Sequence, residues 1–448
     1  MHPSIYISIE SFMPGRHDKF IQLITQHFKV ILSTRRHNFQ LQATDHLEYL
    51  EDIISPLDKE RLIRELNEET DKYIGFLQHN ASSLLNVRIE LEHIKKTIDS
   101  VKSKGNNTLV KAKEFLSLTN YRKICLVLVS AEYSYLSRPI VIEAKKKGIP
   151  VMNIEHGFFA GSCYPDAKIS ESPQLSPFIS DYVIVNNNFE ADLRKSFARE
   201  SRQEHIPLFL PLGTPIANIA PGELSKTRAL RRLKLDPQKK TLSLFTSWVE
   251  PHTPLHIFQL QFEEAAFFDF IFKSIRQYPH RESLQIIIKL HPAFKLFGEK
   301  SVFDYLSDRK RHYGIRNVVI HTDNLPGILS ASDYVICSHF SSVLWEGLEN
   351  NKPLAVRPPG SFLACTKPNI LTRTNELAKH DLLYFILNEF DLHSFLDKYA
   401  KEDQTQQLIE RKNAFMEKWD IRPVSTEEAS LNIIHWIKEN ISGLQETP

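Results

Sequence analysis

The sequence predicts an α/β protein of two Rossmann-like domains that face a cleft, with a helical insertion in the N-terminal domain. Short apolar runs typical of buried strands alternate with helical patterns in both halves of the chain. A proline-rich apolar segment, residues 206–215, separates the two series and suits an ordered linker. A length of 448 residues is ample for two domains. We expect domains at 1–210 and 211–426, with a C-terminal helix over 427–448 that can pack back on the first.

In the first half, predicted strands alternate with helical patterns, which is the order of a parallel sheet. The strands are expected at 5–9, 30–32, 124–129, 151–154 and 182–185. Helices are expected at 18–27 and 138–147, the latter ending at Gly148, and from Phe189 onward. Between about 45 and 118, glycine is scarce, charge is dense and apolar residues recur at helical spacing, so this stretch is the helical insertion.

The second half repeats the alternation. Strands are expected at 242–245, 285–289, 317–321, 334–337 and 352–356, and a helix at 344–350. From residue 375 the chain is predicted to be mostly helical, and 427–439 is amphipathic.

Composition excludes several classes of protein. The net charge of +2 gives no basic excess for nucleic-acid binding. The four cysteines show no metal-site spacing, which favours a reducing compartment. No signal-like start and no apolar run of about 18 residues is seen, so we expect a cytoplasmic protein. A basic run at 226–234 would allow peripheral contact with anionic lipid at the inner face of the cytoplasmic membrane.

Ligands of open α/β sheets bind beyond the carboxyl ends of the strands, so the loops there carry the candidate residues. Lys289-Leu-His-Pro292 ends a strongly apolar strand. Pro292 biases His291 towards extended geometry, and the imidazole can then donate to a phosphate or stabilise a departing nucleotide. A purely structural hydrogen bond of His291 is the alternative.

A second loop, Ser338-His-Phe-Ser-Ser342, lies between a predicted strand and a helix. Hydroxyls and backbone N–H groups at a helix N-terminus form a ready phosphate site, so Ser338, Ser341 and Ser342 are donor-binding candidates. Capping of the helix is compatible with that role. Glu346, one turn into the helix, can accept hydrogen bonds from ribose hydroxyls or simply be solvated.

A third loop, Glu155-His-Gly157, follows a predicted strand of the first half. Glu155 or His156 can remove a proton from an acceptor hydroxyl, and Gly157 permits close approach of that substrate. A buried polar pair supporting a turn is the alternative.

Two further loops also follow strands. Glu10 is another candidate base, and Arg16 is a candidate for binding acceptor anions. Ser247, after the first strand of the second half, is a candidate contact for the donor phosphate.

The absence of several sequence motifs excludes further classes of enzyme. There is no Asp-x-Asp pair of the kind that bridges a metal to a sugar diphosphate, so neither a metal nor another cofactor is expected. Neither G-x-x-x-x-G-K-[ST] nor G-x-G-x-x-G is present. These absences argue against an ATPase, a nicotinamide dehydrogenase and a zinc enzyme.

Three motifs together carry a resemblance: Lys289-Leu-His-Pro292, Ser338-His-Phe-Ser-Ser-Val343 and Asn351-Lys-Pro-Leu354. They resemble the donor half of bacterial surface-polysaccharide transferases of the GT-B fold, namely polysialyltransferases, capsule Kdo transferases and CDP-glycerol glycerophosphotransferases. The resemblance implies CMP- or CDP-activated donors and assigns nucleotide and phosphate binding to His291, Ser341 and Ser342. Glu155-His-Gly157 is similar to the His-Gly loop of the glycerophosphotransferases. It departs from the sialyltransferase pattern of two acidic residues before glycine, which leaves Glu155 and His156 both open as the base.

Three functions follow from these observations. The first is a metal-independent glycosyltransferase that moves a sugar from a nucleotide donor, a CMP-linked acidic sugar such as Kdo or a nonulosonate, to a lipopolysaccharide or capsule glycan. The second is a UDP-sugar transferase or UDP-sugar 2-epimerase of the same fold. The third is a non-catalytic scaffold with that architecture.

Overall fold

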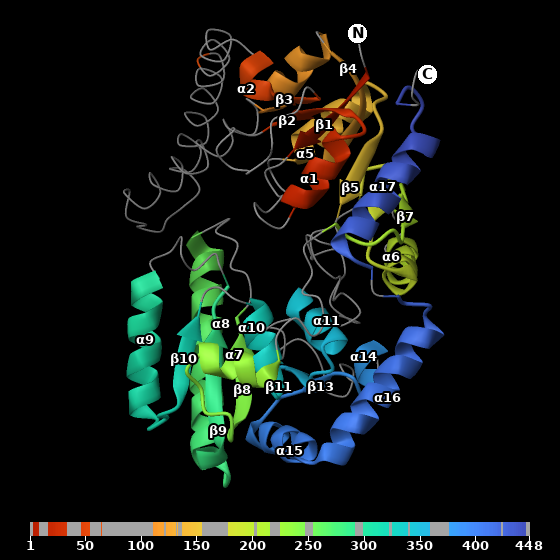
Figure 1. The fold of residues 1–448 in the computed structure, drawn as a ribbon. Helices are drawn as coiled ribbons and strands as arrows, with labels where there is room; N and C mark the ends of the chain where they lie inside the picture. Colours follow the sequence, from red (N-terminus) through yellow and green to blue (C-terminus); the bar gives the residue numbers. More distant parts are fainter. Residues whose placement is uncertain are drawn as a thin grey trace. The chain divides into compact units, whose positions relative to one another are not determined.

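The structure is a computed structural model in which the chain divides into two compact units (Figure 1). The first contains the described residues between 3 and 215 together with 424–444, and the second those between 225 and 422. Most of the predicted insertion at 45–118 lies outside the described residues. The structure describes residues 3–8, 17–33, 46–53, 64, 111–120, 122–130, 132, 137–154, 178–200, 204–215, 225–246, 254–291, 299–321, 325–338, 341–358, 376–422 and 424–444.

The first unit is built on a seven-stranded parallel sheet of order β3-β2-β1-β4-β5-β6-β7. Chain order reverses between β1 and β4, as in a doubly wound fold. The strands are β1 (Pro3–Ser8), β2 (Lys29–Leu32), β3 (Leu47–Tyr49), β4 (Lys123–Val129), β5 (Val151–Ile154), β6 (Tyr182–Ile184) and β7 (Leu208–Leu210).

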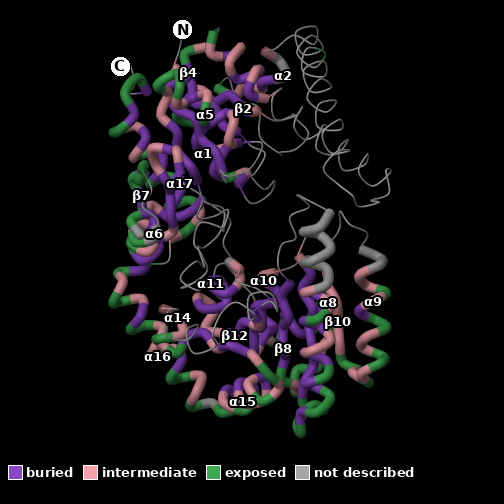
Figure 2. The backbone as a smooth tube through the Cα atoms, turned by 180° about the vertical axis from the view of Figure 1, so that it is seen from behind, coloured by how far each residue is buried: buried purple, intermediate pink, exposed green. Residues whose placement is uncertain are grey.

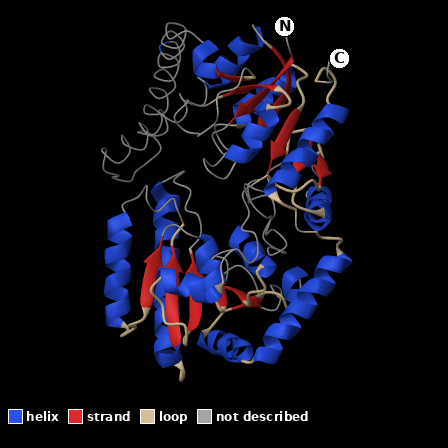
Figure 3. Cartoon of the chain, in the orientation of Figure 1, coloured by secondary structure: helices blue, strands red, loops and turns tan. Residues whose placement is uncertain are grey.

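Helices cover both faces of this sheet because its strands are apolar on both sides (Figure 3). Alternate residues of β1 enter different cores: Ile5 and Ile7 join one cluster and Tyr6 the other. The labelled helices in the described part of the first unit are α1 (Asp18–Thr25), α2 (Leu50–Ile53), α5 (Arg138–Lys146), α6 (Asn188–Glu200) and α17 (Thr426–Asn440), and residues 111–120 are also helical.

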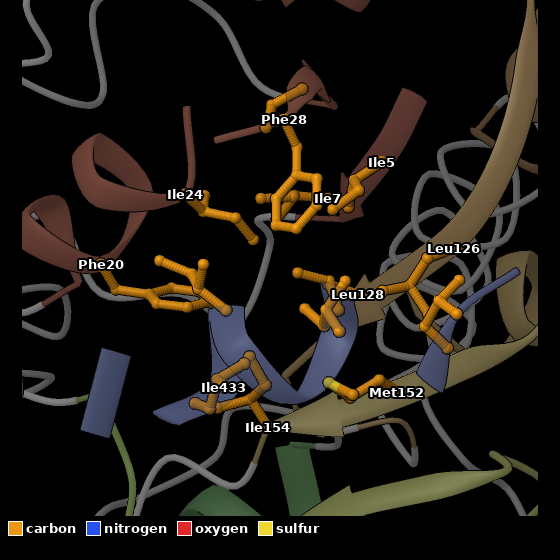
Figure 4. Packing of buried hydrophobic residues seen from close by; sticks show 14 of the residues in the cluster. Ile5, Ile7, Phe20, Ile24, Phe28, Leu126, Leu128, Met152, Ile154 and Ile433 are labelled. Atoms are coloured by element: carbon orange, nitrogen blue, oxygen red, sulfur yellow. The ribbon is translucent and has the colours of Figure 1, made fainter. Parts of the chain in front are cut away.

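The C-terminal helix α17 is part of the first unit's core. Ile433, Ile434 and Ile437 are at most 3% exposed and pack in one cluster with Phe20 and Ile24 of α1 (Figure 4). The amphipathic pattern of 427–439 thus places its apolar side against the N-terminal sheet.

The segment predicted as a linker contains a strand. Leu208–Leu210 is β7, the edge strand paired with β6. Pro207 and Pro211 flank it, and proline is tolerated at a sheet edge, where one side of the strand has no ladder partner. A run of three residues between prolines gives too little pattern to reveal a strand.

The second unit holds a six-stranded parallel sheet of order β10-β9-β8-β11-β12-β13. Buried residues concentrate along the central strands of this sheet, whereas its edge strand at residues 318–321 is of intermediate burial (Figure 2). The strands of this sheet are β8 (Lys240–Phe245), β9 (Leu284–Lys289), β10 (Val318–His321), β11 (Tyr334–Cys337), β12 (Leu354–Val356) and β13 (Tyr384–Phe385).

Chain order in this sheet runs outward from β8 to β10 and then returns to β11 on the other side of β8. The topological switch point therefore lies between β8 and β11. The helices of the unit are α7 (Lys226–Arg232), α8 (Pro254–Gln277), α9 (Glu299–His312), α10 (Leu325–Ala331), α11 (Ser342–Glu349), α14 (Glu376–Lys379), α15 (Glu389–Ala400) and α16 (Glu402–Lys418). None of the helices in the described parts of either unit is long and apolar enough to cross a bilayer.

Candidate functional site

The strand register of the second sheet aligns one row of residues at its carboxyl edge. His321, Lys289, Phe245 and Cys337 are successive partners on β10, β9, β8 and β11. The residues that follow this row therefore leave the sheet at one level, from neighbouring strands about 5 Å apart. Two motifs predicted from the sequence start there. We call Lys289-Leu-His-Pro292 the His-Pro loop and Ser338-His-Phe-Ser-Ser342 the serine loop.

Thr246 links the carboxyl ends of β8 and β9 by two hydrogen bonds. Its backbone N–H donates to the carbonyl of Lys289 at 3.2 Å, and its hydroxyl accepts from the backbone N–H of His291 at 2.8 Å. The main chain of His291 is therefore fixed to the end of β8, the strand that borders the switch point, and His291 is half-buried.

Lys289 and His321 form the outer side of this edge. Lys289 is 7% exposed, and its ammonium donates to the carbonyl of Leu290 at 2.7 Å. Burial lowers the pKa of the His321 imidazole, and the neighbouring Lys289 ammonium lowers it further. His321 is therefore neutral at physiological pH.

On the other side of the switch point, the serine loop leads into α11. Ser341 is the N-cap, with extended backbone (φ −146°, ψ 156°) and a hydroxyl that accepts from the N–H of Val343 at 3.4 Å. No acidic residue occupies the first turn of α11. The partial positive charge of the helix N-terminus is thus not offset by an acidic residue of its own first turn, which suits an anion.

Ser338 is held from two directions. Its backbone N–H donates to the carbonyl of Phe245 at 2.9 Å, and its hydroxyl donates to Oε1 of Glu264 at 2.6 Å. Both Ser338 and Glu264 are buried. The hydroxyl proton of Ser338 therefore points to a carboxylate of α8.

Acidic side chains lie beneath the serine loop. Burial raises the pKa of the Cys337 thiol, and the carboxylates of Glu264 and Glu346 raise it further. Glu346 is 6% exposed, so the surroundings of α11 enclose it. One turn later, burial raises the pKa of Glu349 to about 7, although its carboxylate accepts from the indole N–H of Trp345 at 2.9 Å.

Five candidates from the sequence are thus within the second unit's described residues: Lys289, His291, Ser338, Ser341 and Glu346. For Ser342 only the backbone is described. The other candidates lie outside the described residues: Glu10, Arg16, Glu155, His156, Gly157, Ser247 and Pro292. Sequence reasoning missed His321, although its place at the end of a predicted strand was a usable signal. It also missed Glu264, which lies inside a helix and carries no signal.

In the first unit, Glu132 forms a buried junction close to the exit of β4. Its carboxylate is 1% exposed and accepts from the backbone N–H groups of Ile179 (2.8 Å) and Ser180 (3.1 Å) and from Arg138 (2.7 Å). Burial raises the pKa of Glu132 even so. With this many donors, Glu132 organises the chain beside β5 and β6.

A second buried group of polar side chains follows β6. Glu190 and Arg194 form an ion pair at 3.1 Å with side chains 0% and 2% exposed. Glu190 also accepts from the backbone and side-chain amides of Asn186, both at 3.0 Å. The loop after β6 is thereby fixed to α6.

Within the described ranges, no group of three His, Cys, Asp or Glu side chains is arranged to hold a metal ion. The positive and hydrogen-bonding groups at the second sheet's edge are Lys289, His291, Ser341 and the N-terminus of α11. Such a set can bind a phosphate without a cation.

No protein-family model and no curated protein sequence matches the chain. Solved structures do match over nearly its whole length. A sucrose-phosphate synthase from Thermosynechococcus elongatus has a TM-score of 0.54 at 11% identity, covering 98% of this chain and 99% of its own. A ugt transferase from Siraitia grosvenorii in complex with UDP has a TM-score of 0.52 at 13% identity, covering 97% and 99%. A UDP-N-acetylglucosamine 2-epimerase has a TM-score of 0.50 at 13% identity, covering 100% and 99%. Together with the two parallel sheets, these likenesses show that the chain has the two-domain α/β architecture of the GT-B fold.

Proposed function

We propose that this protein is a glycosyltransferase whose second unit binds the nucleotide of a sugar donor. The observation that carries the proposal is that the His291–Thr246 hydrogen bond and the capped N-terminus of α11 follow strands on the two sides of β8, at the carboxyl edge of one sheet whose switch point lies between β8 and β11. Nucleotides bind at such points in open α/β sheets. The glycosyltransferases among the structural likenesses support the same reading at the level of fold.

In this proposal the donor phosphate lies at the first turn of α11. The hydroxyl of Ser341 and the helix N-terminus contact it from one side, and His291 and the Lys289 charge from the other. Ser342, Ser247 and Pro292 belong to the same loops. Glu346, one turn into α11, is the proposed acceptor for the ribose hydroxyls, and its present exposure of 6% must increase for them to reach it.

The reaction then needs no metal. An acceptor hydroxyl forms a bond to the anomeric carbon, and the bond from that carbon to the phosphate oxygen breaks, so the electron pair leaves with the nucleotide. Stabilisation of the departing phosphate by fixed positive groups is the main catalytic contribution. The hydroxyl proton passes to Glu155 or His156, with Glu10 as the other candidate, while Gly157 and Arg16 contact the acceptor.

For the donor, the motifs favour a CMP-linked acidic sugar such as Kdo or a nonulosonate, and the acceptor would be a lipopolysaccharide or capsule glycan. One observation favours a second candidate. Of the solved structures that are similar to this chain, one is in complex with UDP and another is a UDP-N-acetylglucosamine 2-epimerase. A UDP-sugar transferase or epimerase would use the same phosphate contacts.

Thermal stabilisation by nucleotides tests the proposal. The purified protein is melted with CMP, CDP, UDP or GDP, each with and without EDTA, and the series is repeated for His291→Ala. Ligand at a hundredfold excess over Kd stabilises the folded state by roughly 2.7 kcal/mol. The matched control is His280→Ala, which changes an exposed histidine just before β9 rather than just after it.

Stabilisation by CMP that resists EDTA, is lost in His291→Ala and persists in His280→Ala would support a CMP-sugar transferase. Stabilisation by UDP would favour the second candidate, and release of epimerised sugar without acceptor would identify the epimerase. If no nucleotide stabilises the wild-type protein, the catalytic proposal fails and a scaffold role takes its place.

A further inference from the structure

Glu264 is a buried carboxylate far in sequence from the loop that it contacts. It lies on α8, 74 residues before Ser338, and is 7% exposed. Its Oε1 accepts from the Ser338 hydroxyl at 2.6 Å, a length typical of a charge-assisted hydrogen bond. Burying a carboxylate costs more than burying an apolar side chain of similar size, so stability alone does not account for an acid at this position.

Ser338 is where the serine loop leaves β11. Its backbone is fixed to Phe245 of the neighbouring strand and its side chain to Glu264 of α8. Only two residues separate Ser338 from Ser341, the N-cap of α11. Three peptide steps span at most about 11 Å, so a fixed Ser338 restricts where the first turn of α11 can lie.

The direction of the hydrogen bond separates the roles of the two serines. The Ser338 hydroxyl donates to Glu264, whereas the Ser341 hydroxyl accepts from Val343 and so retains a proton that it can donate to a ligand. A phosphate at the first turn of α11 would then receive a hydrogen bond from Ser341.

We propose that Glu264 is a positioning residue, which holds Ser338 so that Ser341 and the N-terminus of α11 are preorganised to bind the nucleotide phosphate. This inference rests on the proposed function, because it assigns the phosphate to that helix. Glu264 itself does not touch the ligand.

The experiment measures nucleotide affinity by titration calorimetry with CMP, CDP and UDP. It compares wild type with Glu264→Ala, Glu264→Gln, Ser338→Ala and the double variant Glu264→Ala/Ser338→Ala. The control is Glu349→Gln, which alters another carboxylate of the same neighbourhood, bonded to Trp345 rather than to the loop. Melting temperatures are recorded in parallel.

Glu264→Ala and Ser338→Ala should each weaken nucleotide binding about tenfold, the effect of losing one hydrogen bond to a charged group. The double variant should be no weaker than either single one, because both remove the same hydrogen bond. Glu264→Gln keeps an acceptor oxygen and should bind within about twofold of wild type, as should Glu349→Gln. Rescue by glutamine would separate positioning from a general loss of packing.

Unchanged affinity in Ser338→Ala, or single losses that multiply in the double variant, would overturn the inference while nucleotide binding by wild type stands. Ser338→Ala removes only one buried hydroxyl, so this variant tests the positioning role even if Glu264→Ala does not fold. A wild-type protein that binds none of the three nucleotides would instead overturn the proposed function, and this inference with it.

Discussion

The backbone N–H of His291 donates to the side-chain hydroxyl of Thr246 at 2.8 Å, so a side chain from the end of β8 fixes the main chain beyond β9. The two strands are neighbours in the sheet, and β8 borders its switch point. The position of the imidazole at the candidate site thus depends on a residue from another strand.

Replacing Thr246 by valine should weaken nucleotide binding about fivefold, because the His291 N–H loses its acceptor while side-chain volume is kept. Thr246→Ser retains the hydroxyl and should bind like wild type. Calorimetric titration with the nucleotide that stabilises the wild-type protein measures the effect. Equal affinities of the valine and serine variants would show that this hydrogen bond does not position His291.

Removing Arg194 should destabilise the first unit severely. Arg194→Met leaves the buried Glu190 carboxylate without its cation, at a cost of about 3–5 kcal/mol. Lys195→Met is the matched control on the same helix, since its partner Asp192 is exposed and surface pairs contribute about 0–1 kcal/mol. Hydrogen exchange of amides in β6 and α6 reports on this unit by itself. Similar losses of protection in both variants would contradict the expectation.

The pH dependence of the second unit should carry a contribution from Glu349. Its pKa is raised to about 7 in the folded protein from an ordinary value of 4.5, chiefly by burial. The folded state therefore binds more protons than the unfolded state between these values, and Glu349 lowers stability progressively as pH rises through that window.

Glu349→Gln should consequently be more stable than wild type at pH 8, and the difference should vanish below about pH 4.5. Urea titrations across this range measure it. Glu417→Gln, which changes an exposed carboxylate of α16, is the control and should show no such trend. A glutamine variant that is less stable at pH 8 would mean that the ionised Glu349 is stabilising.

Gly213 should not accept a side chain. Its backbone has φ +84°, and an added Cβ would lie 3.0 Å from the Ala429 Cβ and 3.1 Å from Val424 Cγ1. Gly213→Ala should therefore displace α17 as well as strain the backbone. Gly148→Ala has a similar φ of +68° but open space around the Cβ, so it should cost only about 1 kcal/mol. Comparing thermal melting of the two separates packing from backbone strain.

Most of the strands predicted from sequence contain a run of consecutive apolar residues, such as 124–129 and 286–288, because burial on both faces leaves a continuous pattern. The short strands β3, β7 and β13 were not predicted, since two or three residues show no periodicity. The candidate site followed from a positional rule, that ligands gather at strand ends, and so its loop residues could be named. Glu264 could not, because a glutamate within a helical pattern looks the same whether it faces solvent or a loop 74 residues away.

The insertion of α17 into the first unit's core has a consequence for synthesis of the protein. The sheet of that unit is complete when residue 210 has been made, yet the helix that covers Ile5, Ile7 and Phe20 comes more than 200 residues later. At typical translation rates of about 5–20 residues per second, roughly 10–45 s pass between synthesis of β7 and synthesis of α17, and during this time α17 cannot pack on these apolar side chains. We therefore expect chaperones to bind the exposed apolar side chains of the nascent first unit. This unit completes its native core only after the second unit has been synthesised.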